Sequence, residues 1–145
     1  MAGLTRFHEA QERVWRTALA ELRAGHKTSH WMWFIFPQLT ALGRSGTARH
    51  YGIADAAEAR AYLADPVLRA RLDACADAIL SHRDERPEAI LGTVDALKLR
   101  SSATLFALAG EGTATGARMQ AILDRFYGGD PCPLTLALVG RDGSA

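Results

Sequence analysis

The segment Ser29–Gln38 holds the side chains of this chain that are best suited to chemistry. Four aromatic rings, Trp31, Trp33, Phe34 and Phe36, fall within this segment, although aromatic residues make up only 8% of the chain. Such rings supply apolar area and flat faces on which a base can stack. Core packing is the favoured role for most of them, because rings at helical spacing are usually buried. Trp31 and Trp33 lie on different sides of any helix, so we expect one indole to line a cleft.

His30 directly precedes these rings and is a candidate catalytic residue. An imidazole titrates near neutral pH, so a neighbouring carboxylate or apolar burial can fit it for proton transfer. A structural histidine bonded to the backbone is an equally open interpretation. The sequence favours neither role over the other.

The lysines are informative because there are two of them, Lys27 and Lys98, among 17 basic residues. The other 15 are arginine. Such a bias indicates that lysine is kept where a compact ammonium is needed, as for a phosphate contact or a neutral amine. Chance and a local salt bridge are the alternative. We therefore take Lys27 as a candidate ligand-binding residue and Lys98 as a candidate catalytic one.

Lys98 belongs to a polar cluster with Asp95, Ser101 and Ser102. Spacings of three and four residues bring these groups to one face of a helix, whereas Arg100 points elsewhere. The cluster could hold a phosphate or carboxylate, or it could lock one helix to another. A nucleophilic serine is disfavoured, because no glycine elbow surrounds it. Asp95, Arg100, Ser101 and Ser102 join the candidate ligand-binding residues.

Gln38 and Arg44 complete the candidate ligand-binding set, together with Trp31 and Trp33. The Gln38 amide could read a base or cap a helix, and Arg44 lies in a loop with backbone donors for an anion. The sequence contains no HExxH motif, no clustered metal ligands and no dinucleotide fingerprint. It therefore predicts neither a metal nor a cofactor.

Composition indicates an all-α protein of one domain, residues 1–145. The chain is 145 residues long, 48% hydrophobic and of net charge +1, which argues against nucleic acid or a membrane as the main partner. Cys75 and Cys132 are too few for a disulfide framework and are expected to be free thiols. No signal peptide or membrane-spanning run is apparent, so we expect a cytoplasmic protein.

The elements that would position these residues are helices, because no sustained alternation typical of strands occurs. Caps and apolar periodicity predict helices at 5–24, 31–36, 47–51, 56–64, 66–80, 87–91, 94–109, 119–126 and 134–139, with a frayed tail after Gly140. Thr5 and Thr93 are among the expected caps, and Val67 and Leu97 are placed on apolar stripes. The fold class that follows is a single-domain orthogonal helical bundle of about five to seven helices with irregular loops.

Read together, these motifs resemble a family numbered 1810 among domains of unknown function (DUF1810). The resemblance rests on Arg6-Phe7, Ala10-Gln11, Lys27–Leu39, Tyr62-Leu63, Pro66–Leu68, Arg71-Leu72, Asp95, Lys98–Ser102, Thr104–Phe106 and Thr135-Leu136. It covers nearly the whole chain and implies a small, mainly helical bacterial protein of a kind sometimes mislabelled calpastatin. It implies no established reaction. The chain departs from the family pattern at Ala103 and around Pro131 and Pro133.

Two functions follow as hypotheses. The first is a pocket between the segment His30–Gln38 and the helix carrying Lys98–Ser102, which would bind an anionic, nucleotide-like molecule. Were it an enzyme, hydrolysis or transfer at a phosphate or glycosidic bond would be the expected class, with His30 as acid or base. The second is a module that binds a protein partner or forms a homodimer through exposed aromatic rings. Convergence of the polar groups on a concave surface would favour the first.

Overall fold

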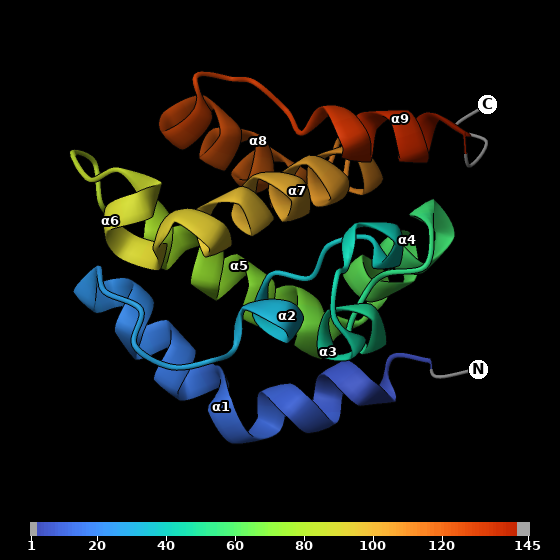
Figure 1. Ribbon diagram of the computed structural model, residues 1–145, viewed down its shortest axis with the longest axis horizontal. Coiled ribbons are helices and arrows are strands. Elements are labelled where there is room, and N and C mark those ends of the chain that lie inside the picture. The colour runs from blue at the N-terminus through green and yellow to red at the C-terminus, as the bar shows by residue number, and fades with distance from the viewer. Residues whose placement is uncertain (1–2, 142–145) are drawn as a thin grey trace.

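A computed structural model describes residues 3–141 of the chain. Within them the elements are α1 (Thr5–Ala24), α2 (Met32–Ile35), the 3-10 turn η1 (Thr40–Leu42), α3 (Gly46–His50), α4 (Ala56–Ala64), α5 (Pro66–Leu80), α6 (Pro87–Leu91), α7 (Thr93–Ala109), α8 (Ala114–Tyr127) and α9 (Pro133–Arg141). Strand-like pairing in the described residues is limited to an isolated bridge between Leu39 and Ile53. The predicted all-α fold is confirmed (Figure 1).

The helices form one continuous core. Helix α1 runs along one side of the molecule and α8 and α9 along the other, with α5 and α7 between them (Figure 1). Helix α7 packs against α4, α6, α8 and α9, and α5 packs against α1 and α8. The largest fully buried side chains, which include Trp31, Tyr62, Phe7, Phe36 and Phe106, come from both halves of the chain. Six of the nine α-helices in this part of the chain have at least seven residues, as a bundle of five to seven main helices requires.

Local signals set most helix boundaries where the sequence predicts them. Gly25 ends α1 with φ of 78°, a conformation that favours glycine. The Asp55 side chain caps α4, and the Asp65 side chain caps α5, which Pro66 begins. Thr93 is the first helical residue of α7 and not its cap, because Gly92 at φ of 87° makes the turn.

Three further expectations are corrected. Thr5 is likewise the first residue of α1, after Leu4, and caps nothing. Val67 and Leu97 are 44% and 62% exposed, since helical periodicity cannot separate a stripe that faces the core from one that faces a groove. The last helix begins at Pro133, and the predicted frayed tail falls mainly on residues 142–145, outside the described range.

No helix among residues 3–141 combines the length and the apolar character needed to cross a membrane.

The approach of α8 to the end of α7 depends on Gly116. A Cβ atom there would lie 2.6 Å from the carbonyl carbon of Gly110, which belongs to backbone and cannot rotate away. We expect Gly116→Ala to lower the free energy of unfolding by about 1–3 kcal/mol, the usual cost of overpacking. Gly46→Ala is the matched control, because a Cβ atom at that position would meet nothing within 4 Å and the change should be near neutral. Urea denaturation of both variants measures the difference, and equal stability of the two would contradict this packing.

Candidate functional site

The loop between α1 and α2 is held by one carboxylate, that of Glu21. Its Oε1 accepts hydrogen bonds from the Thr28 N–H at 2.8 Å, the Ser29 N–H at 3.0 Å and the Trp31 indole Nε1–H at 3.0 Å. Its Oε2 accepts a fourth from Ser29 Oγ at 2.6 Å. Burial alone would raise the pKa of Glu21, but these four bonds outweigh it and lower the pKa to about 2. The carboxylate therefore fixes the start of the aromatic segment.

Trp31 belongs to the core and not to a ligand site. Its side chain is fully buried, and its N–H is bonded to Glu21. The prediction that Trp31 contacts a ligand is wrong, because no face of the ring is open. Of the four rings in the segment, Phe34 and Phe36 are buried as well, and Trp33 is the partly exposed one.

Lys27 and Lys98 share Asp95. The Lys27 Nζ lies 2.9 Å from Asp95 Oδ2, and the Lys98 Nζ lies 3.5 Å from Asp95 Oδ1. Each ammonium also lies over an indole, Lys27 at 5.1 Å from the Trp31 ring centre and Lys98 at 5.5 Å from that of Trp33. The arrangement ties the loop after α1 to the first turns of α7.

A cleft of about 620 Å³ opens beside this charge cluster, between the α2–α3 region and helices α7 and α9. Its volume is in the range of small-molecule sites, roughly 300–1,000 Å³. The lining residues are Trp33, Gln38, Leu42, Arg44, Ser45, Ala48, Val94, Leu97, Lys98, Ser101, Cys132 and Leu134. Five of the residues singled out from the sequence, Trp33, Gln38, Arg44, Lys98 and Ser101, thus come together.

The cleft has an apolar side and a cationic side. Val94, Leu97 and Leu134 are 66%, 62% and 64% exposed, an unusual degree for large aliphatic side chains that border one cavity. On the cationic side, Arg44 is exposed and makes no ion pair with any residue in 3–141, so its guanidinium is open to an anion. Lys98 shares its carboxylate with Lys27, which leaves the local charge positive.

Cys132 is a cleft residue that the sequence identifies only as a free thiol. Both cysteines are free, as predicted. Ser101 Oγ donates a hydrogen bond to Cys132 Sγ at 3.4 Å, and the Cys132 N–H donates to Thr104 Oγ1 at 2.9 Å. One signal could have revealed the thiol: Cys132 immediately precedes Pro133, and proline favours the first position of a helix.

Other predicted residues lie outside the cleft. His30 is exposed beside Trp33, its ring centre 6.5 Å from that of the indole, and does not line the cavity. Arg100 donates from Nε to the Asp130 carbonyl oxygen at 2.9 Å and so connects α7 to the segment before α9. Ser102 is fully buried, so the prediction that it contacts a ligand is wrong. Sequence spacing placed Ser102 on the face of Lys98, but its side chain is covered by the packing around α7.

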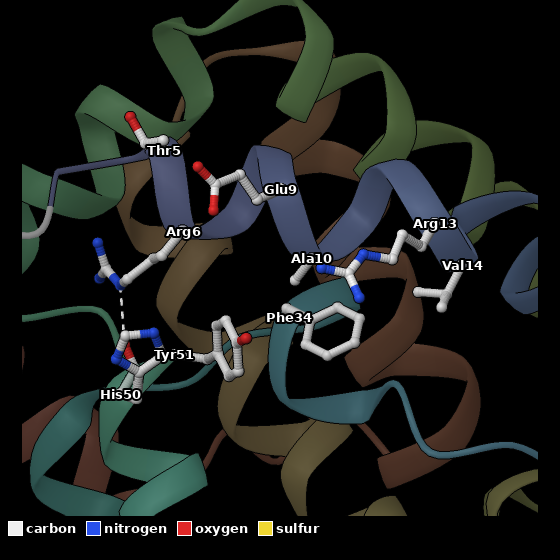
Figure 2. Close-up of a pocket in the computed structure, with 9 residues that line it drawn as sticks. All are labelled: Thr5, Arg6, Glu9, Ala10, Arg13, Val14, Phe34, His50 and Tyr51. Atoms are coloured by element: carbon white, nitrogen blue, oxygen red, sulfur yellow. Dashed lines mark hydrogen bonds between the residues drawn. The ribbon is translucent and has the colours of Figure 1, made fainter.

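A second cleft of about 530 Å³ lies between α1 and the side chains of Phe34, His50 and Tyr51. Figure 2 shows its lining residues, with Phe34 and Tyr51 side by side and Arg6 pointing toward His50. The Arg6 guanidinium donates to the His50 carbonyl oxygen at 2.9 Å and to Glu58 Oε1 at 2.8 Å. Because these bonds join α1 to the α3–α4 connection, this cation serves the fold and is not free for a ligand.

No group of three or more histidine, cysteine, aspartate or glutamate side chains in residues 3–141 is arranged to hold a metal ion.

Comparison with known proteins agrees with the motifs and the fold. The model of the family described as "Protein of unknown function (DUF1810)" matches residues 1–139, and the chain belongs to this family. The crystal structure of the conserved hypothetical protein Rv1873 from Mycobacterium tuberculosis is similar, with 44% sequence identity and a TM-score of 0.89. The similarity covers 94% of this chain and 96% of that one. No curated protein matches.

The hydrogen bonds to Glu21 predict a pH-dependent contribution to stability. The folded-state pKa of about 2 is below the unfolded value of about 4.3, so the contribution is present above pH 4.3 and is lost as the pH falls toward 2. We expect Glu21→Gln to lower the free energy of unfolding by about 1–3 kcal/mol at pH 7. The deficit should shrink between pH 4.3 and 2, as urea titrations at several pH values would measure.

Glu9→Gln is the control for this prediction, since Glu9 is exposed on the same helix. Its effect should stay within about 0.5 kcal/mol. A deficit of Glu21→Gln that is the same at pH 3 and pH 7 would show that the carboxylate charge is not what holds the loop.

Proposed function

We propose that the cleft beside Lys98 binds a small anionic molecule with a planar ring, of the size and chemistry of a nucleotide. One observation carries the proposal: Trp33 and Gln38 from one motif and Lys98 and Ser101 from the other line the same cavity. Two segments about 60 residues apart in the chain thereby supply an aromatic face, an amide, a hydroxyl and a cation to one concave surface. Those are the groups that a ring and a phosphate need.

The ring of the ligand is assigned to Trp33. This partly exposed indole lines the cleft, and the Lys98 Nζ lies over its ring at 5.5 Å from the centre. Stacking of a base on an aromatic ring contributes roughly 1–3 kcal/mol and tolerates many ring types. Gln38, with a donor and an acceptor on one amide, can reach the edge of the base.

The anionic group of the ligand is assigned to Arg44 and Lys98. Arg44 offers a planar pair of donors without a carboxylate partner in the described chain, and Lys98 offers a compact charge. Ser101 also lines the cleft, and because its hydroxyl proton is donated to Cys132 Sγ, its oxygen can accept a further hydrogen bond. The role predicted for Lys27 becomes indirect: it pairs with Asp95 at 2.9 Å and so helps to hold the carboxylate that orients Lys98.

Binding, and not turnover, is the function proposed. Lys98 lines the cavity, but His30, the other candidate acid or base, does not, and no carboxylate side chain of residues 3–141 lines the cavity to act in its place. The alternative function is an interaction module or homodimer that uses exposed aromatic rings. Of the four rings in the segment, Trp33 is exposed enough to serve it, because Trp31, Phe34 and Phe36 are buried in the core. A hydrolase or transferase activity would need a second acid or base in the cavity. The ligand would have to supply it, or the loop that carries His30 would have to move.

Thermal unfolding in the presence of AMP, ADP, ADP-ribose and ribose 5-phosphate tests the proposal, with uncharged adenosine for comparison. A ligand at 100 times its Kd stabilises the folded protein by about 2.7 kcal/mol, which is an easily measured rise in Tm. We expect the phosphorylated compounds to raise Tm more than adenosine does. A panel in which no compound raises Tm would contradict the proposal.

Three variants test whether a ligand that raises Tm binds in the cleft. Lys98→Met and Arg44→Gln should each reduce the rise in Tm, measured from the Tm of that variant alone. Arg49→Gln removes the same charge from exposed surface of α3 outside the cleft lining and should keep the full rise. Equal stabilisation of all three variants would place the ligand elsewhere. A concentration-dependent dimer in size-exclusion chromatography, unaffected by Lys98→Met, would favour the interaction module instead.

A further inference from the structure

The two free cysteines lie in opposite surroundings. Cys75 is fully buried within α5, and burial raises the pKa of its thiol to about 12. Cys132 is partly exposed and lines the cleft with Lys98 and Arg44. Since the thiolate and not the thiol attacks electrophiles, one chain contains an inert cysteine and a second one that is accessible.

The sulfur of Cys132 accepts a hydrogen bond from Ser101 and belongs to the residue directly before helix α9. Ser101 Oγ, on a side chain that is 6% exposed, donates to Sγ at 3.4 Å. Cys132 directly precedes α9, where its carbonyl oxygen accepts from the Leu136 N–H at 3.1 Å, so the sulfur is close to the positive end of that helix. Partial burial would raise the pKa of Cys132, but the Ser101 hydroxyl together with Thr135 and the backbone of the first turn of α9 lower it below its ordinary value. The Thr135 hydroxyl is fully buried and has no hydrogen-bond partner among the described residues.

The cavity adds room and charge in front of this thiol. The space of about 620 Å³ beside the sulfur is in the range of small-molecule sites, and Arg44 has no carboxylate partner in the described chain. An anionic reagent would thus be attracted to the cleft in which the thiolate forms. The site consists of the cavity, its two cations and the sulfur together.

We propose that Cys132 is a modification site, at which the cleft captures anionic low-molecular-weight disulfides as a mixed disulfide. The Cys132 thiolate attacks one sulfur of the disulfide, a new S–S bond forms to Cys132, and the disulfide's own S–S bond breaks. The leaving half departs as a thiolate and takes a proton from water. The Cys132 sulfur is oxidised, and the incoming disulfide is the oxidant that is reduced.

Modification would also close the cleft to its ligand. The attached group fills the space in front of Lys98 and Ser101, and its carboxylates occupy the cations. This regulatory consequence rests on the proposed function, whereas the reaction at Cys132 does not. A reducing thiol would reverse it, because thiol–disulfide exchange runs in both directions.

The first experiment measures the reaction of the intact protein with glutathione disulfide by mass spectrometry and peptide mapping. We expect one adduct, on Cys132, and none on Cys75. The rate should depend on pH with a midpoint below that of free cysteine, and Ser101→Ala should shift this midpoint upward and slow the reaction several-fold at neutral pH. An adduct on Cys75 of similar yield, or a Cys132 rate no greater than that of a free cysteine at the same pH, would overturn the proposal.

The second experiment tests the preference for an anion. Glutathione disulfide carries net negative charge, and hydroxyethyl disulfide is neutral. Arg44→Gln should slow the first reagent several-fold and leave the second nearly unchanged, and Arg49→Gln should affect neither. If Arg44→Gln leaves the ratio of the two rates unaltered, the cleft does not select anionic disulfides. Because Arg44 is exposed, the variant is expected to fold normally.

The two proposals can fail separately. Selective modification of Cys132 in a protein that no nucleotide stabilises would leave the modification site standing without its ligand. Nucleotide stabilisation that persists fully after Cys132 has been thiolated would overturn the regulatory consequence. Loss of that stabilisation, and its return after reduction with dithiothreitol, is the result we expect.

Discussion

The Glu21 carboxylate is the constraint on which the rest of the site depends. Four donors from the loop after α1 converge on its two oxygens, and one of them is the indole N–H of Trp31. With Trp31 fixed in the core, the short helix that follows must present Trp33 on another side, because residues two apart on a helix do not share a face. A single carboxylate thereby determines which indole stabilises the fold and which one lines the cleft. Trp31 is fully buried, so its indole N–H would cost about 1–3 kcal/mol if Glu21 left it unpaired.

Asp95 makes the second connection, between this loop and α7. It explains why lysine occurs at two positions of a chain in which arginine is otherwise used: both ammonium groups fit between one carboxylate and the face of an indole. Lys27 is nearly buried in this role, whereas Lys98 is more open and keeps donors for the cleft. Lys27 thus has a structural role, and Lys98 is the lysine available for binding. The two cysteines differ in the same way, because Cys75 is buried in α5 and Cys132 lines the cavity.

The sequence predicts the helices well because their boundaries are local. Gly25, Asp55 and Asp65 act through hydrogen bonds and φ values within a few residues, and periodicity locates the core. It predicts part of the site for the same reason, since Lys98 and Ser101 share a turn. It cannot decide between Trp31 and Trp33, because that choice depends on a carboxylate ten residues away in sequence. The Cys132-Pro133 pair places the thiol at the start of a helix, but the sequence does not show that it reaches the cleft, because that depends on the docking of α9 on α7, 31 residues from Ser101.

The indole N–H signals of the protein offer the most direct test that one tryptophan is structural and another lines a ligand site. In ¹⁵N-labelled protein, Trp15, Trp31 and Trp33 give three separate signals that substitution can assign. Titration with AMP should move the Trp33 signal and leave those of Trp31 and Trp15 in place, because Trp31 is enclosed and bonded to Glu21. A ligand that moves the Trp31 signal as much as that of Trp33, or moves neither while it binds, would contradict this account.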